Sequence, residues 1–309
     1  MKAIIDLTPN YHPIPNTEEY QDTWIAVNSF IFPGGEPHAQ VELIDSTESE
    51  EDYPFNEIKI TMKVKSFNDL GRLISVVDAL RHSQFKDLEL KLILPYFPGA
   101  RQDRKVEGEE FGVKLYADII NNLKFSSVTI LDPHSEVTPA LIDNVYVIDN
   151  HGFIAFVVQD IKKRTGRFPI LVSPDAGSSK KMYDLLSGLN RRFDGFPNLI
   201  YQGTKHRDMT TGKLSGFSID MDRENDVRTP LLIVDDICDG GGTFIGLAEV
   251  ILPKLSVDKN LFLAVTHGIF SKGFEKLLIP FKKLYSTDSF IDSNEDIGHI
   301  VTIFKQELI

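Results

Sequence analysis

The feature that most constrains the fold is the stretch from Leu231 to Phe244, whose sequence is LLIVDDICDGGGTF. Its first four residues, Leu231 to Val234, are apolar, as is typical of a parallel strand that is buried on both faces. The glycines that follow predict a tight turn, and the residues after them predict a helix. Because open parallel sheets bind ligands at the carboxyl ends of their strands, this stretch predicts an α/β fold with a ligand-binding loop.

The residues that follow this strand favour a phosphorylated sugar as the ligand. Asp235 and Asp236 can bind ribose hydroxyls or a divalent ion. The next residues form a loop at a helix start, where unpaired backbone amides and the helix dipole attract a phosphate. This phosphate loop consists of Asp239, Gly240, Gly241, Gly242 and Thr243. A tight turn in an ordinary α/β domain is the alternative interpretation, because a glycine-rich turn alone is weakly specific.

The composition argues against several classes of protein. With 309 residues, 42% of them hydrophobic, the chain is long enough for two domains that each have a core. A formal charge of -12 argues against general binding of nucleic acid or of an anionic membrane. Cys238 is the only cysteine, so no intrachain disulfide can form, and we expect a cytoplasmic protein. We expect neither a signal peptide nor a membrane-spanning segment.

Helical and strand-like patterns alternate along the chain, as parallel sheets require. Ser66 is expected to cap the first helix. Further helices are expected at 111–123, 153–161 and 179–186, and strands at 24–32, 88–94, 128–131, 145–148, 169–173, 199–201, 231–234, 261–265 and 283–285. We therefore expect two domains, 1–148 and 149–309, each with a mostly parallel sheet flanked by helices.

The stretch from Gln202 to Gly216 differs from the rest of the second domain. It is polar, and it contains the cations Lys205 and Arg207. We expect a mobile flap rather than core at 202–216, with a strand returning at 217–221. Such a flap can close over phosphates and exclude water.

The stretch from Leu231 to Phe244 resembles the binding signature for phosphoribosyl pyrophosphate (PRPP) that type I phosphoribosyltransferases share with ribose-phosphate pyrophosphokinases. Further blocks resemble the pyrophosphokinases and not the transferases, and together they cover most of the chain from Phe32 to Asp288. These blocks are Phe32 with Glu36, FPGARQDRK at 97–105, DPH at 132–134, SPDAG at 173–177 and KHR at 205–207. The resemblance implies a type I phosphoribosyltransferase-like fold and pyrophosphokinase activity.

The resemblance also implies a role for each of these residues. The residues expected to bind ATP are Phe32, Glu36, Arg101, Gln102, Asp103 and His134. His134 and Asp175 are expected to organise Mg²⁺, and Lys205 and Arg207 are expected to be catalytic. Asp235 and Asp236 are expected to hold the ribose hydroxyls, and the phosphate loop to hold the phosphate. Taken singly, His134 could cap a loop, and the cations could be solvated surface residues.

The expected reaction transfers the β,γ-diphosphate of ATP, with Mg²⁺, to the anomeric hydroxyl of ribose 5-phosphate, giving PRPP and AMP. Such a transfer needs in-line geometry and neutralised phosphate oxygens, so metal ions and a Lys/Arg pair suit it. A homo-oligomer is expected, because family members donate the adenine-binding turn of Phe32 and Glu36 from a neighbouring subunit. The alternatives are a phosphoribosyltransferase, which would consume PRPP with a base, and a catalytically silent regulatory homologue.

Three departures from the family pattern concern the substrate and the assembly. The family usually has Asp-Thr-x-Gly-Thr in the phosphate loop, so Gly240 removes a hydroxyl that would contact the sugar phosphate. We expect Gly240 to open space that would admit a 5-substituted ribose phosphate such as ADP-ribose. Gly34 stands where an aspartate is usual in the adenine-binding turn. From Phe290 to Ile309 we find no long helix before a last strand, which leaves hexameric assembly and regulation by ADP or phosphate open.

Overall fold

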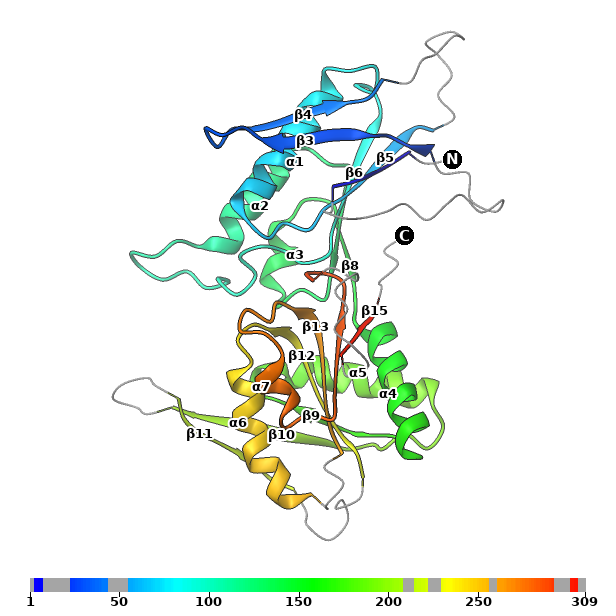
Figure 1. Ribbon diagram of the computed structural model, residues 1–309, viewed down its shortest axis with the longest axis vertical. Helices are drawn as coiled ribbons and strands as arrows, with labels where there is room; N and C mark the ends of the chain where they lie inside the picture. Colours follow the sequence, from blue (N-terminus) through cyan, green and yellow to red (C-terminus); the bar gives the residue numbers. More distant parts are fainter. Residues whose placement is uncertain are drawn as a thin grey trace. The chain divides into compact units, whose positions relative to one another are not determined.

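The computed structural model describes residues 3–7, 23–43, 55–207, 214–221, 229–255, 260–291 and 301–304. The chain divides into two compact units, Met1–Ile148 with Leu308–Ile309, and Asp149–Glu307. Each unit has a predominantly parallel sheet and its own hydrophobic core. The predicted α/β architecture is therefore confirmed (Figure 1).

The amino-terminal unit is built on a six-stranded sheet with the order β2-β1-β5-β6-β7-β8. Every neighbouring pair in this sheet is parallel. The strands are β1 (Ala3–Asp6), β2 (Thr23–Trp24), β5 (Glu57–Thr61), β6 (Glu89–Leu94), β7 (Ser127–Leu131) and β8 (Val145–Ile148). Because β6 and β7 are parallel neighbours, the segments that leave their carboxyl ends start at the same edge of the sheet.

The described part of this unit contains three helices, namely α1 (Phe67–Arg81), α2 (Gly112–Asn122) and α3 (Val137–Leu141). Ser66 caps α1 as predicted, because its hydroxyl accepts a hydrogen bond from the backbone N–H of Asp69. The Asp69 carboxylate accepts one in return from the backbone N–H of Ser66, at 2.9 Å, which completes a capping box.

A hairpin of β3 (Val27–Ile31) and β4 (Pro37–Val41) forms a separate two-stranded sheet. It packs on α1, where Arg72 donates to the Ser29 hydroxyl at 2.8 and 3.0 Å. The single strand expected at 24–32 is therefore wrong, because Trp24 belongs to β2 and residues 27–31 form β3 of this hairpin. Tertiary packing on α1 makes this division, and the local sequence carries no signal of it.

The carboxyl-terminal unit is built on a seven-stranded sheet with the order β11-β10-β9-β12-β13-β14-β15. Only β11 runs antiparallel to its neighbour. The strands are β9 (Ile170–Ser173), β10 (Ile200–Arg207), β11 (Leu214–Ile219), β12 (Leu231–Cys238), β13 (Leu261–Gly268), β14 (Lys283–Thr287) and β15 (Val301–Phe304). The carboxyl ends of β9, β10, β12 and β13 therefore share one edge of the sheet, where ligands are expected.

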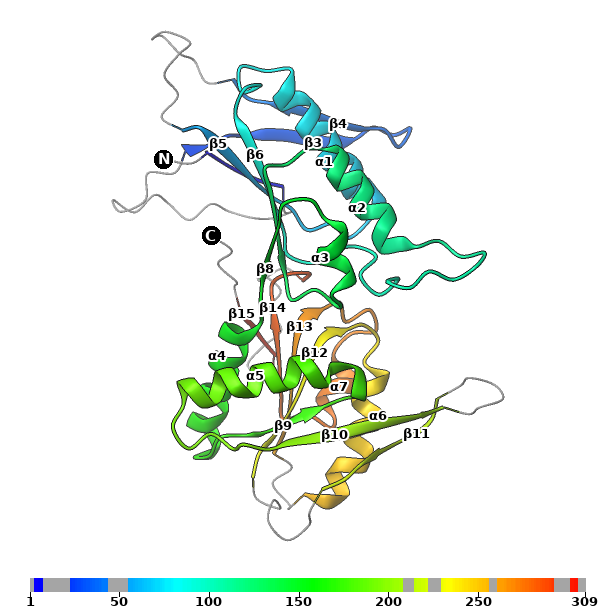
Figure 2. The same ribbon diagram turned by 180° about the vertical axis from the view of Figure 1, so that it is seen from behind.

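Both faces of this sheet are covered by helices, as Figures 1 and 2 show from opposite sides. Leu231 and Ile233 pack with α6, whereas Leu232 and Val234 pack with α4 and α5. Alternate residues of β12 therefore belong to two hydrophobic clusters, one on each face of the sheet. The helices are α4 (His151–Thr165), α5 (Ser179–Arg192), α6 (Gly242–Ile251) and α7 (Glu275–Leu278), with 3-10 turns at Ala176–Ser178 and Leu252–Lys254. In the described chain, none of the helices has the length and apolar character needed to cross a bilayer.

Three strands extend further than the sequence predicted. β12 and β13 remain paired as far as Cys238 and Gly268, so Asp235 and Asp236 lie within a strand and not after it. The first part of the expected flap is likewise β10, which pairs with β11 up to Arg207. The strand expected at 199–201 therefore continues to Arg207, and the first residues of the expected flap form one arm of the β10–β11 hairpin, because pairing with a neighbouring strand overrides polar composition.

Candidate functional site

In the carboxyl-terminal unit, an ion pair joins two residues that are 30 positions apart in the chain. Lys205 lies on β10, and its ammonium donates to the Asp175 carboxylate at 2.6 Å. Asp175 follows β9, the neighbour of β10, and its other carboxylate oxygen accepts from the Gly177 backbone N–H at 3.0 Å. Both side chains are partly exposed, at 23% for Lys205 and 34% for Asp175, so phosphate oxygens can approach the pair.

Polar side chains brace the segment that carries Asp175. The Ser179 hydroxyl donates to the Gln202 side-chain oxygen at 3.0 Å, which connects the start of α5 to β10. The Gln202 amide donates to the Ser173 hydroxyl at 3.3 Å, and the Ser173 and Ser178 hydroxyls lie 2.6 Å apart. These contacts fix the segment against β10 and orient Asp175 toward Lys205.

The two acids of β12 lie close to this ion pair. Burial raises the pKa of Asp235 well above its usual range, and the negative charges of Asp236 and Asp175 raise this pKa further. The Asp235 carboxylate also accepts a hydrogen bond from the backbone N–H of Asp236 at 3.0 Å. The structure thus brings together three carboxylates and one ammonium, from the segment after β9 and from β10 and β12. Ribose hydroxyls or a divalent cation would relieve the repulsion among these carboxylates.

The phosphate loop leads from β12 into α6. Gly241 is the N-cap residue of α6, with φ of 77°, a conformation that favours glycine. No side chain caps this helix start, and the backbone N–H groups of Phe244 and Ile245 both donate to the Gly241 carbonyl. An anion that binds at the loop would therefore meet the positive end of α6 without competition from a capping side chain.

The space that Gly240 was expected to open is bordered by the side chain of Lys272. A Cβ on Gly240 would lie 3.2 Å from both Cδ and Cε of Lys272. Lys272 follows β13, and the neighbouring Ser271 hydroxyl donates to the Asp239 carboxylate of the phosphate loop. Sequence reasoning missed Ser271 and Lys272 as site residues. The available signal was their position after an apolar run, at the carboxyl end of the strand next to β12.

In the amino-terminal unit, two predicted ATP-binding segments leave neighbouring strands at one sheet edge. The segment with Arg101 and Gln102 follows β6, the segment with His134 follows β7, and the Leu131 backbone N–H donates to the Pro95 carbonyl at 3.1 Å. Arg101 and His134 are exposed. Gln102 instead braces its own loop, because its amide donates to the Glu110 carboxylate at 2.6 Å.

Phe32 and Glu36 lie in the turn of the β3–β4 hairpin, where the Phe32 backbone N–H donates to the Glu36 carbonyl at 2.8 Å. The Phe32 ring is 45% exposed. Its centroid lies 4.8 Å from that of Phe30 and 5.5 Å from that of His38, so three rings form an exposed cluster. A Cβ on Gly34 would meet the Glu36 carboxylate, which is the exposed end of a flexible side chain.

The predicted site residues are divided between the two units. The amino-terminal unit holds Phe32, Glu36, Arg101, Gln102, Asp103 and His134, with Asp103 partly buried. The carboxyl-terminal unit holds Asp175, Lys205, Arg207, Asp235, Asp236 and the phosphate loop. The side chain of Arg207 and residues 208–213 lie outside the described part of the chain. Among the described residues, no group of three or more His, Cys, Asp or Glu is arranged as a metal site.

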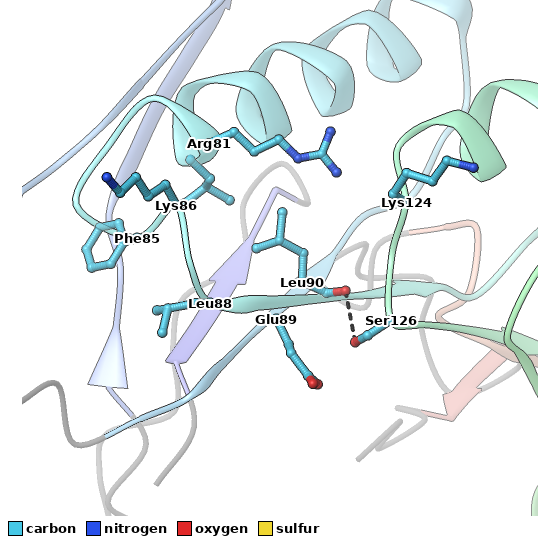
Figure 3. Close-up of a pocket in the computed structure, with 9 residues that line it drawn as sticks. Arg81, Phe85, Lys86, Leu88, Glu89, Leu90, Lys124 and Ser126 are labelled. Atoms are coloured by element: carbon cyan, nitrogen blue, oxygen red, sulfur yellow. Dashed lines mark hydrogen bonds between the residues drawn. The ribbon is translucent and has the colours of Figure 1, made fainter.

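A cavity of about 210 Å³ lies elsewhere in the amino-terminal unit. Figure 3 shows its lining, which includes Arg81, Lys124 and Ser126, and the Ser126 hydroxyl donates to the Leu90 carbonyl. Leu90 and Ser126 are at the amino ends of β6 and β7. This cavity is therefore at the edge of the sheet opposite to the predicted ATP-binding segments, and no predicted site residue lines it.

Comparison with known proteins identifies the family. No protein-family model matches the sequence. The chain is 30% identical over 291 residues to the ribose-phosphate pyrophosphokinase of Mycoplasmopsis pulmonis, a match that covers 89% of this chain and 79% of that protein. It is also 30% identical over 230 residues to the ribose-phosphate pyrophosphokinase of Bradyrhizobium diazoefficiens, covering 73% of this chain and 67% of that protein.

A solved structure shares the fold. The crystal structure of phosphoribosylpyrophosphate synthetase from Mycobacterium smegmatis superposes with a TM-score of 0.72 at 19% identity, covering 93% of this chain and 88% of that one. The predicted type I phosphoribosyltransferase-like fold is thus confirmed, and the relatives decide between the two enzyme classes that use the PRPP signature. The chain belongs to the ribose-phosphate pyrophosphokinase family.

Proposed function

We propose that this enzyme transfers the β,γ-diphosphate of ATP to the anomeric hydroxyl of ribose 5-phosphate. The hydroxyl oxygen attacks the β-phosphorus, and the bond from that phosphorus to the oxygen shared with the α-phosphate breaks. AMP leaves with the bonding electron pair, the hydroxyl proton passes to solvent, and PRPP is formed. The observation that carries this proposal is the convergence of Asp175, Lys205 and the two acids of β12 beside the phosphate loop.

The acceptor would be held by β12 and the loop that follows it. Asp235 and Asp236 are placed to bind the ribose hydroxyls, and the elevated pKa of Asp235 allows its carboxyl group to donate as well as accept hydrogen bonds. The phosphate would sit at the start of α6, where no side chain competes for the backbone amides.

Lys205 is the residue proposed to stabilise the transferred group. A fixed cation lowers the energy of the transition state if it meets the phosphate charge that develops there. The ion pair with Asp175 orients the Lys205 ammonium before substrate arrives. Arg207, two residues further along β10, is proposed to act beside it.

Magnesium is the proposed cofactor. It usually binds through one or two carboxylates, with waters and substrate phosphates as its other ligands, so a three-residue protein cage is not required. Asp175 fits this use, because its carboxylate is partly exposed and adds to the charge that raises the pKa of Asp235. His134 is proposed as the second protein group that organises the metal. When bound, magnesium would neutralise phosphate oxygens and hold them in position.

ATP is proposed to bind to the amino-terminal unit through Arg101, Gln102 and Asp103. Phe32 and Glu36 would provide the adenine-binding turn for a neighbouring subunit of a homo-oligomer. The exposed ring cluster around Phe32 supports this role, because an exposed aromatic face suits stacking on a base.

The direct test is incubation of the purified protein with ATP, Mg²⁺ and a panel that contains ribose 5-phosphate and ADP-ribose, followed by mass analysis of the products. The expected result is AMP and PRPP in equal amounts, formed from ribose 5-phosphate. A clear preference for ADP-ribose would replace ribose 5-phosphate as the proposed acceptor. The Lys272 stem beside Gly240 narrows the space on which that alternative depends. If no AMP is released with any acceptor, the result would support the alternative that this protein is a catalytically silent regulatory homologue.

A further inference from the structure

The segment that follows β13 is held against the end of β12. The backbone N–H groups of Ile269 and Phe270 both donate to the Cys238 carbonyl, at 2.9 and 3.1 Å. Next to them, the Ser271 hydroxyl donates to the Asp239 carboxylate. Three hydrogen bonds thus join this segment to the phosphate loop and to the residue before it.

Lys272 lies in a tight turn within this segment, in which the Gly273 backbone N–H donates to the Phe270 carbonyl at 2.8 Å. Gly273 has φ of 73°, so the turn is suited to glycine at that position. The Lys272 side chain crosses Gly240, and its Cδ, Cε and Cγ lie 3.2, 3.2 and 3.6 Å from the place that a Cβ on Gly240 would take. The ammonium nitrogen is one bond beyond Cε and therefore close to the phosphate loop.

The charge of Lys272 is available to a ligand. Among the described residues, no carboxylate forms an ion pair with its ammonium, and its side chain is exposed. Asp239 introduces a negative charge into the phosphate loop, and this charge opposes the binding of a phosphate dianion. A cation over the same loop offsets that repulsion.

We propose that Lys272 is a specificity-determining residue of the acceptor site, whose ammonium binds the 5-phosphate of the ribose. This inference rests on the proposed function. Gly240 lacks the threonine hydroxyl that is usual in the family, and the Lys272 stem lies against the place that a Cβ would take there. A charged donor binds phosphate more strongly than a neutral hydroxyl. The site therefore favours an acceptor that ends in a phosphomonoester dianion over one whose phosphate is esterified twice and carries one charge.

Two substitutions at Lys272 separate charge from packing. Lys272→Met keeps the aliphatic stem without the charge, whereas Lys272→Arg keeps the charge. We expect Lys272→Met to raise the KM and the calorimetric Kd for ribose 5-phosphate about tenfold or more, and Lys272→Arg to restore most of the loss. The KM for ATP and the thermal midpoint should stay unchanged. The matched control is Lys276→Met, which removes an exposed lysine of the neighbouring α7.

Gly240→Thr provides an independent variant. It should weaken ribose 5-phosphate binding when Lys272 is present, because the threonine side chain would displace the Lys272 stem and its ammonium. It should weaken binding less in the Lys272→Met background, which has no ammonium to displace. Equal effects in both backgrounds would overturn the inference.

The possible outcomes distinguish this inference from the proposed function. If the protein makes PRPP and Lys272→Met leaves the KM for ribose 5-phosphate unchanged, the inference alone is overturned. An equal rise in the KM for ATP would overturn it too, because the effect would not be specific to the acceptor. If the protein binds ribose 5-phosphate without making PRPP, the proposed function fails and the Kd of Lys272→Met still decides the inference. If the protein binds no ribose 5-phosphate, both fail.

Discussion

Replacement of Lys205 by alanine separates a catalytic role from a structural one. The variant removes the ion pair with Asp175, whose side chains are 23% and 34% exposed. Solvent screens a pair of this exposure, so its loss should lower the free energy of unfolding by at most about 1 kcal/mol. Loss of a cation aimed at the transferred phosphates should cost about 3–4 kcal/mol of transition-state stabilisation, or about 10²- to 10³-fold in kcat.

The assay for Lys205→Ala is steady-state AMP release with ATP binding measured separately, together with urea unfolding of the same preparation. Lys91→Ala is the matched control, because Lys91 forms an ion pair with Glu57 in the amino-terminal unit, with side chains 29% and 16% exposed. We expect both variants to lose similar stability and only Lys205→Ala to lose turnover. A kcat within about threefold of the unmodified enzyme would refute the role of Lys205.

Two further predictions concern side chains of the carboxyl-terminal unit whose pKa values are shifted, Asp160 and Cys238. Burial alone would raise the pKa of Asp160, but hydrogen bonds from Arg164, Tyr285 and Lys283 outweigh it and lower that pKa to about 2. Asp160→Asn should therefore lower the free energy of unfolding at pH 7 by about 1–2 kcal/mol. This difference should shrink in urea unfolding as the pH falls from 4 toward 2, and a constant difference would contradict it. Burial raises the pKa of the Cys238 thiol to about 12. Alkylation of this thiol at pH 8 should therefore be at least about 100-fold slower in the folded protein than in urea. Mass spectrometry measures both rates, and equal rates would show that the thiol is accessible in the folded protein.

Local signals in the sequence identify much of the fold. The Ser66 cap and the apolar run at Leu231 act over a few residues, and the structure contains the helix and the buried strand that they predict. The ends of β12 and β13 depend instead on pairing between Asp235 and Val265 and between Cys238 and Gly268. These partners are 30 residues apart, so composition alone placed the strand ends too early. β15 was missed for a similar reason, because its assignment depends on pairing with β14.

In the candidate site too, the local sequence indicates single residues, whereas their contacts depend on the pairing of distant strands. The sequence pointed to Asp175 and Lys205 separately, and only the parallel pairing of β9 with β10 brings their side chains to 2.6 Å. The missing side chain at Gly240 is visible in the sequence, whereas the neighbour that borders the space is not. That neighbour is Lys272, in a turn after β13; it is 32 residues further along the chain and adjacent only in the folded sheet.

The most direct test of diphosphate transfer is to follow ATP labelled on both the β- and γ-phosphates in the presence of Mg²⁺ and ribose 5-phosphate. We expect both labels to appear together in PRPP, with one unlabelled AMP for each PRPP. Labelled ADP with a singly labelled sugar would mean transfer of one phosphate and would contradict diphosphate transfer.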